Sequence, residues 1–155
     1  MVERAHISDI ASLTALRLEF LQEDCGELSG EIKSKLIEAL PAYFEKNLNH
    51  NIFCYLIREM EEVVACAFLL IVEKPANPMF ITGRTGTVLN VYTKPICRHK
   101  GYAKAIMNTL LQDAVELNLS FVELESTEAG YDLYKSIGFT DDAASKYHPM
   151  KWYNV

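Results

Sequence analysis

The sequence predicts an α/β fold of the mixed (α+β) kind, a mostly antiparallel sheet of six to seven strands with helices on both faces. Two observations predict it. The spacing of apolar residues changes repeatedly between helical and strand-like along the 155-residue chain, and these periods distinguish amphipathic helices from strands. The resulting elements follow neither a strict βα alternation nor an antiparallel meander, so we expect a mixed sheet in the order β-α-α-β-β-β-α-β-α-β(-β).

The N-terminal third is predicted to hold one short strand and two helices. The strand covers residues 2–6. Apolar residues at helical spacing then predict a first helix from residue 10 to about 24 and a second over 32–47. Pro41 lies within the second helix and is expected to kink or split it, because proline has no amide hydrogen to donate.

Three strands are predicted in the middle of the chain. Residues 52–57 and 63–72 are apolar runs rich in β-branched and aromatic residues, with Glu61-Glu62 at the turn. This pattern is typical of an antiparallel hairpin. A loop that contains Gly86 then leads to a third strand at 87–92.

The C-terminal part begins with the most regular helix of the chain. Residues 101–117 carry one continuous apolar stripe at positions three and four apart. A strand at 121–125 and a short helix at 128–137 follow. Phe139 begins a polar tail, in which residues 150–153 are expected to form a final strand.

The composition favours one globular domain over residues 1–155. Half of the residues are hydrophobic and 23% are charged, which is an ordinary balance for a soluble protein that needs no disulfide bonds. Fifteen basic and 21 acidic side chains give a net charge of -6. This balance argues against a nucleic-acid-binding protein, because phosphate contacts need a basic face.

The sequence carries no recognisable targeting or metal-binding signal. The first residues lack the apolar core of a signal peptide, and no stretch approaches the ~20 apolar residues of a membrane span, so we expect a cytoplasmic protein that does not bind membranes. The four cysteines form no CxxC pair and are expected to be free thiols. No metal site is expected, because the four histidines are dispersed along the chain, as His6, His50, His99 and His148.

The segment 88–103 is the most informative part of the chain. A strand ends, a short loop follows, and the regular helix opens at Gly101. Small residues at a helix start leave several amide hydrogens unobstructed, and these donors together with the helix dipole favour a phosphate. Arg98, Lys100 and Lys104 add positive charge to this end of the helix.

Arg98, Gly101 and Ala103 match the pattern Q/R-x-x-G-x-G/A. The segment therefore resembles the diphosphate-binding motif of the GNAT superfamily of acetyl-CoA-dependent N-acetyltransferases. Residues 128–139 resemble the family's C-terminal signature A-x-x-L-Y-x-x-x-G-F, which they match at Leu133, Tyr134, Gly138 and Phe139. The resemblance implies a GNAT-like fold over the whole chain and acetyl-CoA as cosubstrate.

The resemblance also implies roles for particular residues. Val91, Tyr92 and Thr93 are expected to line the pantetheine arm of acetyl-CoA, where the strand splays from its neighbour. Tyr134 is expected to donate to the coenzyme A sulfur. Thr127 stands where the family often has an asparagine that contacts the cofactor. The amides that would hold the diphosphate, with the Arg98 side chain alongside, are those of His99, Lys100, Gly101, Tyr102, Ala103 and Lys104.

The acceptor site is less clearly marked. Asn90 is a polar residue in an apolar strand and is a candidate to orient an acceptor, together with Glu23 and Glu27. Their negative charge suits a cationic amine. The general base stays open among His148 and the acidic residues of the first helix and the residues that follow it, namely Glu19, Glu23, Asp24, Glu27 and Glu31.

The expected function is transfer of an acetyl group from acetyl-CoA to a primary amine of a small molecule or peptide, by direct attack in a ternary complex. A monomer or homodimer would carry it out. The alternative is a module of the same fold that binds acyl-CoA without turnover. A third hypothesis, an acyltransferase with Cys97 as nucleophile beside His99, is weakened because adjacent residues rarely present both side chains to one point. The identity of the amine is not encoded in any motif.

Overall fold

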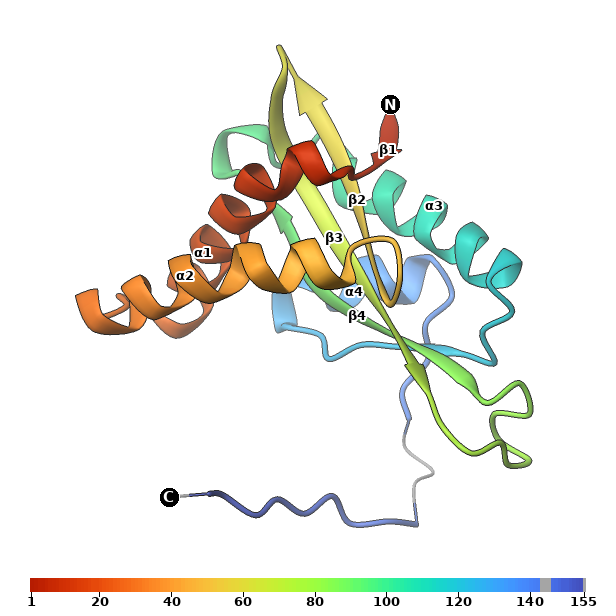
Figure 1. Cartoon of the computed structure of the whole chain (residues 1–155). Helices are drawn as coiled ribbons and strands as arrows, with labels where there is room; N and C mark the ends of the chain where they lie inside the picture. The colour runs from red at the N-terminus through yellow and green to blue at the C-terminus, as the bar shows by residue number, and fades with distance from the viewer. Residues whose placement is uncertain (143–145, 155) are drawn as a thin grey trace. The chain divides into compact units, whose positions relative to one another are not determined.

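The computed structural model describes residues 1–142 and 146–154 (Figure 1). The chain forms two compact units, Met1–Glu125 and Ser126–Val155. The first unit holds a sheet of five strands in the spatial order β1-β2-β3-β4-β5. The strands are β1 (Val2–Arg4), β2 (Ile52–Glu59), β3 (Glu62–Glu73), β4 (Arg84–Thr93) and β5 (Val122–Glu123).

The sheet is mixed and mostly antiparallel, as the sequence predicts. Strands β1 to β4 pair antiparallel, and only the β4–β5 pair is parallel. The described residues form five strands instead of the six to seven expected. The turn between β2 and β3 falls on Met60 and Glu61, which have φ of +48° and +68°, rather than on Glu61-Glu62. Two successive positive φ angles suit the right-handed twist of a tight hairpin.

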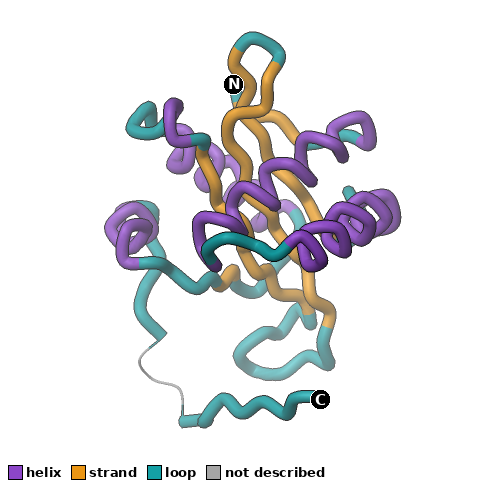
Figure 2. The backbone as a smooth tube through the Cα atoms, turned by 90° about the vertical axis from the view of Figure 1, so that its left-hand side faces the viewer, coloured by secondary structure: helices purple, strands orange, loops and turns teal. Residues whose placement is uncertain are grey.

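Two helices cover one face of this sheet, α1 (Ile10–Cys25) and α2 (Gly30–Asn47), and α3 (Tyr102–Glu116) packs on the other (Figures 1 and 2). Side chains of α1 and α2 share a buried cluster with Cys54 and Phe68 of the sheet. The rings of Phe44 and Phe68 meet edge to face, with centroids 5.6 Å apart. Tyr55, next to Cys54, is fully buried on the opposite face, because side chains alternate along a strand.

Three local expectations are corrected by the structure. Helix α2 is continuous through Pro41, and the carbonyl of Ile37 that loses its helical donor belongs to a residue that is 50% exposed, where water can replace the bond. Gly86 lies within β4 rather than in a loop. The strand expected at 121–125 is shortened to Val122–Glu123, because β4 pairs with it only at Gly86 and Thr87.

In the second unit, residues 126–142 and 146–154 form one helix, α4 (Glu128–Ser136), and are otherwise without regular secondary structure. The Thr127 hydroxyl caps α4 by accepting a hydrogen bond from the Gly130 amide at 3.3 Å. Gly138, with φ of +105°, follows the helix end. The expected strand at 150–153 is wrong, since these residues pair with no strand of the described chain, and an unpaired extended segment lacks the bonds that define a sheet.

Candidate active site

The N-terminus of α3 presents unpaired amide groups. A single 3-10 turn, Pro95–Cys97, leads into a loop where His99 and Gly101 have φ of +63° and +79°. The first amide bonded into the helix is that of Ala105, which donates to the Gly101 carbonyl at 3.0 Å. Within the described chain, no hydrogen-bond acceptor is recorded for the amides of residues 99–104. These donors and the positive end of the helix dipole form a site for an anion.

The carboxylate of Glu59, on β2, is bonded to side chains of this loop and of the first residue of α3. Glu59 accepts hydrogen bonds from the Lys100 ammonium, at 2.8 Å, and from the Tyr102 hydroxyl. Its second oxygen lies 3.8 Å from the Cys97 sulfur. The bonds from Lys100 and Tyr102 keep the pKa of Glu59 below its ordinary value. The loop conformation that exposes the amides is therefore fixed by one carboxylate.

The adjacent edge of β4 is unpaired. Pairing with β5 stops at Thr87, so within the described chain residues 88–93 have a partner strand only on the β3 side. Asn90 and Val91 stand opposite the single residue Ala67, which makes a β-bulge, and Asn90 has φ of +54°. A bulge re-aims backbone groups and is common beside binding sites. Free backbone donors and acceptors on this edge can pair with an extended, amide-bearing ligand.

Asn90 is engaged by two side chains. It is 4% exposed. Its oxygen accepts a hydrogen bond from Arg17 Nη1 at 3.2 Å, and its Nδ2 lies 3.4 Å from the Cys66 sulfur. Burial raises the pKa of the Cys66 thiol to about 12, so this thiol is neutral at pH 7. Both ends of the Asn90 amide are thus occupied by the protein.

A second polar cluster connects α1 with the end of β4. The Tyr92 hydroxyl donates to Glu23 at 2.9 Å and lies 3.3 Å from Glu19. Arg98 Nη2 contacts both oxygens of Glu23, and Arg98 Nε donates to the Thr93 carbonyl at 2.9 Å. The Arg98 bond keeps the pKa of Glu23 below its ordinary value. Burial and the Glu23 carboxylate raise the pKa of Tyr92, which stays a protonated donor.

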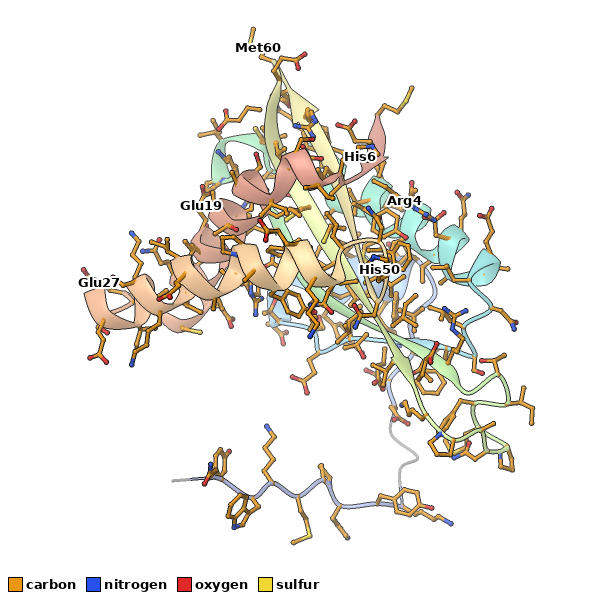
Figure 3. All side chains as sticks on the ribbon, in the orientation of Figure 1. Arg4, His6, Glu19, Glu27, His50 and Met60 are labelled. Carbon is orange, nitrogen blue, oxygen red and sulfur yellow. The ribbon has the colours of Figure 1, made fainter. Side chains whose placement is uncertain are left out.

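Apart from Glu19, the other acidic residues of this stretch have no hydrogen bond to that cluster within the described chain. Figure 3 shows Glu19 along α1 and Glu27 at the far end of the α1–α2 hairpin. Glu31 pairs with Lys35 on the same helix at 2.7 Å. Of the acceptor residues expected from the sequence, the structure brings Glu23 to Arg98 and Asn90 to Arg17, whereas Glu27 is exposed and has no hydrogen bond or ion pair among the described residues.

Sequence reasoning did not single out two residues of the site, Arg17 and Glu59. Arg17 occupies a position at helical spacing with Leu13 and Phe20, both apolar. A charged residue within an apolar stripe is the sequence feature by which Arg17 could have been recognised as a candidate. Glu59 gives no comparable signal, because its partners are 41 and 43 positions away.

Tyr134 and Thr127 belong to the second unit. Tyr134 lies on α4, and its ring meets Phe139 edge to face with centroids 5.9 Å apart. Burial raises the pKa of Tyr134, so its hydroxyl is protonated at neutral pH. A Cβ atom on Gly130 would lie 2.8 Å from the Tyr134 ring, which explains the glycine one turn earlier on α4. Thr127 uses its hydroxyl for the helix cap described above.

The described residues also bear on metal binding and membrane insertion. In 1–142 and 146–154, no group of three or more His, Cys, Asp or Glu side chains is arranged to hold a metal ion. Cys25, Cys54, Cys66 and Cys97 are free thiols. No helix in the described part of the chain is both long enough and apolar enough to cross a bilayer.

Comparison with known proteins identifies related sequences and folds. Residues 16–139 match the family described as "Acetyltransferase (GNAT) family". A "predicted acetyltransferase with acetyl-CoA" from Clostridium acetobutylicum is 26% identical, with a TM-score of 0.83 over 97% of this chain and 95% of that chain. No curated protein matches the sequence significantly.

Two further solved structures share the fold at lower identity. A GCN5-related N-acetyltransferase from Ralstonia eutropha JMP134 is 21% identical, with a TM-score of 0.79 and 97% of each chain covered. A ribosomal-protein-alanine N-acetyltransferase from Brucella melitensis biovar Abortus 2308 is 20% identical, with a TM-score of 0.67 over 97% of this chain and 99% of that chain. At these identities the likeness concerns the fold alone.

Proposed function

Because the chain belongs to the GNAT family of acetyltransferases, we propose that it transfers the acetyl group of acetyl-CoA to a primary amine of a small molecule or peptide. One observation carries the proposal: the unpaired amides at the α3 N-terminus lie directly after the unpaired edge of β4. A diphosphate fits the first feature, and the amide-bearing pantetheine arm fits the second.

The cofactor would contact the residues expected from the sequence. The amides of residues 99–104 would hold the diphosphate, and Val91, Tyr92 and Thr93 would line the pantetheine arm. The Arg98 side chain would act differently from that expectation, because it is bound to Glu23 and to the Thr93 carbonyl. It would brace the end of β4 against α1 and leave phosphate binding to the amides.

The reaction needs a neutral amine, a donor for the tetrahedral oxyanion and a proton for the leaving sulfur. The amine nitrogen would form a bond to the thioester carbon, and the carbon–sulfur bond would then break. Tyr134 would donate a hydrogen bond or its proton to the departing thiolate. The amine proton would pass to an acidic residue of α1, directly or through water. Glu23 suits this step poorly, because Arg98 keeps its pKa low.

Thermal-shift titration with acetyl-CoA and with coenzyme A tests binding, and a free-thiol release assay over a panel of amines tests transfer. Binding of acetyl-CoA with release of thiol that depends on the amine would support the enzyme. Binding without any transfer would favour the alternative, an acyl-CoA-binding module. That alternative is favoured by Thr127, whose hydroxyl caps α4 where the family often has a cofactor-binding asparagine.

A further inference from the structure

Arg17 is a partly buried cation that forms no ion pair with any carboxylate of the described chain. It lies on the face of α1 that packs toward the sheet, and its Nη1 donates to the neutral Asn90 side chain at 3.2 Å. Its guanidinium also lies 5.6 Å from the centre of the Phe20 ring. Burial lowers the pKa of Arg17, but a guanidinium stays charged in a protein. A buried charge is ordinarily paired, because removing it from water is costly.

Two of the carboxylates nearest in sequence are engaged by other groups, and the third, Asp24, acts on Arg17 only at longer range. Glu23 is bound by Arg98 and by the Tyr92 hydroxyl. Glu19 lies 3.3 Å from the Tyr92 hydroxyl and 3.9 Å from the Lys94 ammonium. Within 1–142 and 146–154, no carboxylate lies within 4.0 Å of the Arg17 nitrogens. Arg17 therefore has no directly bonded carboxylate in the described chain, and only the longer-range attraction of Asp24 offsets its charge.

Asn90 positions this cation. The asparagine sits at the β4 bulge with a positive φ, and Cys66 fixes the other end of its amide. Since its oxygen accepts only one of the five guanidinium hydrogens, Arg17 keeps donors free for a ligand. The arrangement gives Asn90 a different role from the acceptor contact expected from the sequence, because its amide is already satisfied by the protein.

A second unpartnered polar group lies one turn away. Thr14 is only 8% exposed, and its hydroxyl has no hydrogen-bond partner in the described chain. Residues three apart on a helix share a face, so Thr14 and Arg17 border the same region of α1. A buried hydroxyl without a partner is uncommon and calls for an explanation such as an absent ligand.

We propose that Arg17 binds a carboxylate of the acceptor, with the Thr14 hydroxyl as an additional donor, so that the substrate is an amino acid or another amine that bears a carboxylate. The inference rests on the proposed function and names its substrate class. The guanidinium fork suits a carboxylate because two parallel hydrogen bonds can form. Arg17 is held at Asn90, immediately before the β4 residues proposed to carry the thioester arm. The carboxylate would therefore fix the amine beside the acetyl group.

The test measures kcat/KM by thiol release with L-amino acids and with their carboxamides, which differ only in the charged group. The wild type is expected to prefer the acids. Arg17→Gln should lower kcat/KM for the acids by about tenfold or more, the effect of one charge-assisted hydrogen bond, and leave the carboxamides nearly unchanged. Acetyl-CoA affinity, measured by calorimetry, should stay at the wild-type level in the variant and reports that it is folded.

Asn90→Asp is a second, nearly isosteric variant. It places a carboxylate where the amide oxygen now meets Arg17, so the guanidinium gains an internal counterion. The preference for acids over carboxamides should fall, mainly through KM for the acids. If this variant keeps the wild-type preference for acids, the assignment is contradicted. A selective loss for the acids would support it, because a merely structural role of Asn90 would affect both substrate series alike.

The outcomes separate this inference from the proposed function. If the protein binds acetyl-CoA but acetylates carboxamides as well as acids, or if Arg17→Gln weakens both series equally, the carboxylate assignment is overturned and the acetyltransferase stands. Binding of acetyl-CoA with transfer to no carboxylate-bearing amine overturns the assignment as well. Absence of both acetyl-CoA binding and transfer overturns the function and the inference together.

Discussion

Arg98 Nη2 lies 2.6 and 2.9 Å from the two carboxylate oxygens of Glu23, so the arginine of the α3 motif is tied to α1. The same arginine donates to the Thr93 carbonyl at the end of β4. Three elements therefore meet at one guanidinium, directly before the loop that exposes the α3 amides. The contact therefore fixes the chain that leads into α3, and it leaves the amides at the helix N-terminus free to bind a ligand.

The Arg98–Glu23 pair should contribute little stability and should show a defined pH dependence. The Arg98 and Glu23 side chains are 40% and 45% exposed, so a double-mutant cycle with Glu23→Gln and Arg98→Met should give a coupling free energy below about 1 kcal/mol at pH 7. The pKa of folded Glu23 lies below its ordinary value of 4.5. The coupling should therefore be complete above that pH and disappear as the pH falls through the lowered pKa. Urea unfolding at a series of pH values measures it.

Glu27→Gln is the control for this cycle, because Glu27 belongs to the same acidic stretch and has no ion pair among the described residues. Coupling between Glu27 and Arg98 should be near zero at every pH. A Glu23–Arg98 coupling that grows on acidification would show that the pair does not form in solution as the structure has it.

Gly101→Val should weaken acetyl-CoA binding by at least tenfold, or about 1.4 kcal/mol. The chain itself leaves room for a side chain, since a Cβ atom at Gly101 would meet nothing within 4 Å. The loss would come from the position of that side chain at the exposed amides and from its strain at φ of +79°. Isothermal titration calorimetry with acetyl-CoA measures the affinity.

Gly26→Val is a matched control for backbone strain. Gly26 follows α1, has φ of +81°, and also has open space around its Cβ position. The Gly26→Val substitution should lower the melting temperature yet leave acetyl-CoA affinity unchanged. Wild-type affinity in a folded Gly101→Val variant would exclude the α3 N-terminus as the diphosphate site.

Glu59→Gln should loosen the loop before α3. The change removes the charge that pairs with Lys100 and weakens the bond from Tyr102. We expect faster amide hydrogen exchange at Cys97 and Arg98, whose amides donate to the Lys94 and Pro95 carbonyls just before the loop. Acetyl-CoA affinity should be lower by about two- to tenfold, the effect of one hydrogen bond. Glu73→Gln, which removes an exposed ion pair with Arg84, should change neither quantity. Unaltered exchange in the Glu59 variant would show that this carboxylate does not order the loop.

How far the sequence predicts these features depends on whether the cause is local. The sequence predicts both ends of helix α3 within one residue, because its apolar stripe is continuous. For Gly86 the sequence predicts a loop, because the need for a glycine within β4 comes from distant residues. A Cβ atom there would lie 2.7 Å from the Leu69 side chain and 3.0 Å from that of Leu119. The contact with Leu69 follows only from the register of β3 and β4.

The candidate site divides in the same way. Gly101 and its neighbours follow from a local pattern of strand, loop and helix start. The meeting of Arg17 with Asn90 joins residues 73 positions apart, and it depends on a bulge that turns Asn90 into the left-handed region. Periodicity marks both residues as unusual in their elements, but it does not pair them.

Tyr134→Phe should lower kcat for acetyl transfer by about 10²-fold, the lower end of general acid catalysis, because water can replace the phenol as donor. Burial raises the pKa of Tyr134, so the phenol is neutral and able to donate at pH 7, and its bond to sulfur would strengthen as charge develops on the thiolate. The variant removes only the hydroxyl and retains the ring contact with Phe139. Acetyl-CoA affinity and the melting temperature should therefore match the wild type, as calorimetry and thermal melts can check.

The same substitution at Tyr131, whose hydroxyl donates to Asp141 on the surface, is the control and should leave kcat unchanged. Turnover within about twofold of the wild type in Tyr134→Phe, under conditions where the chemical step limits the rate, would assign Tyr134 a structural role and place the acid elsewhere.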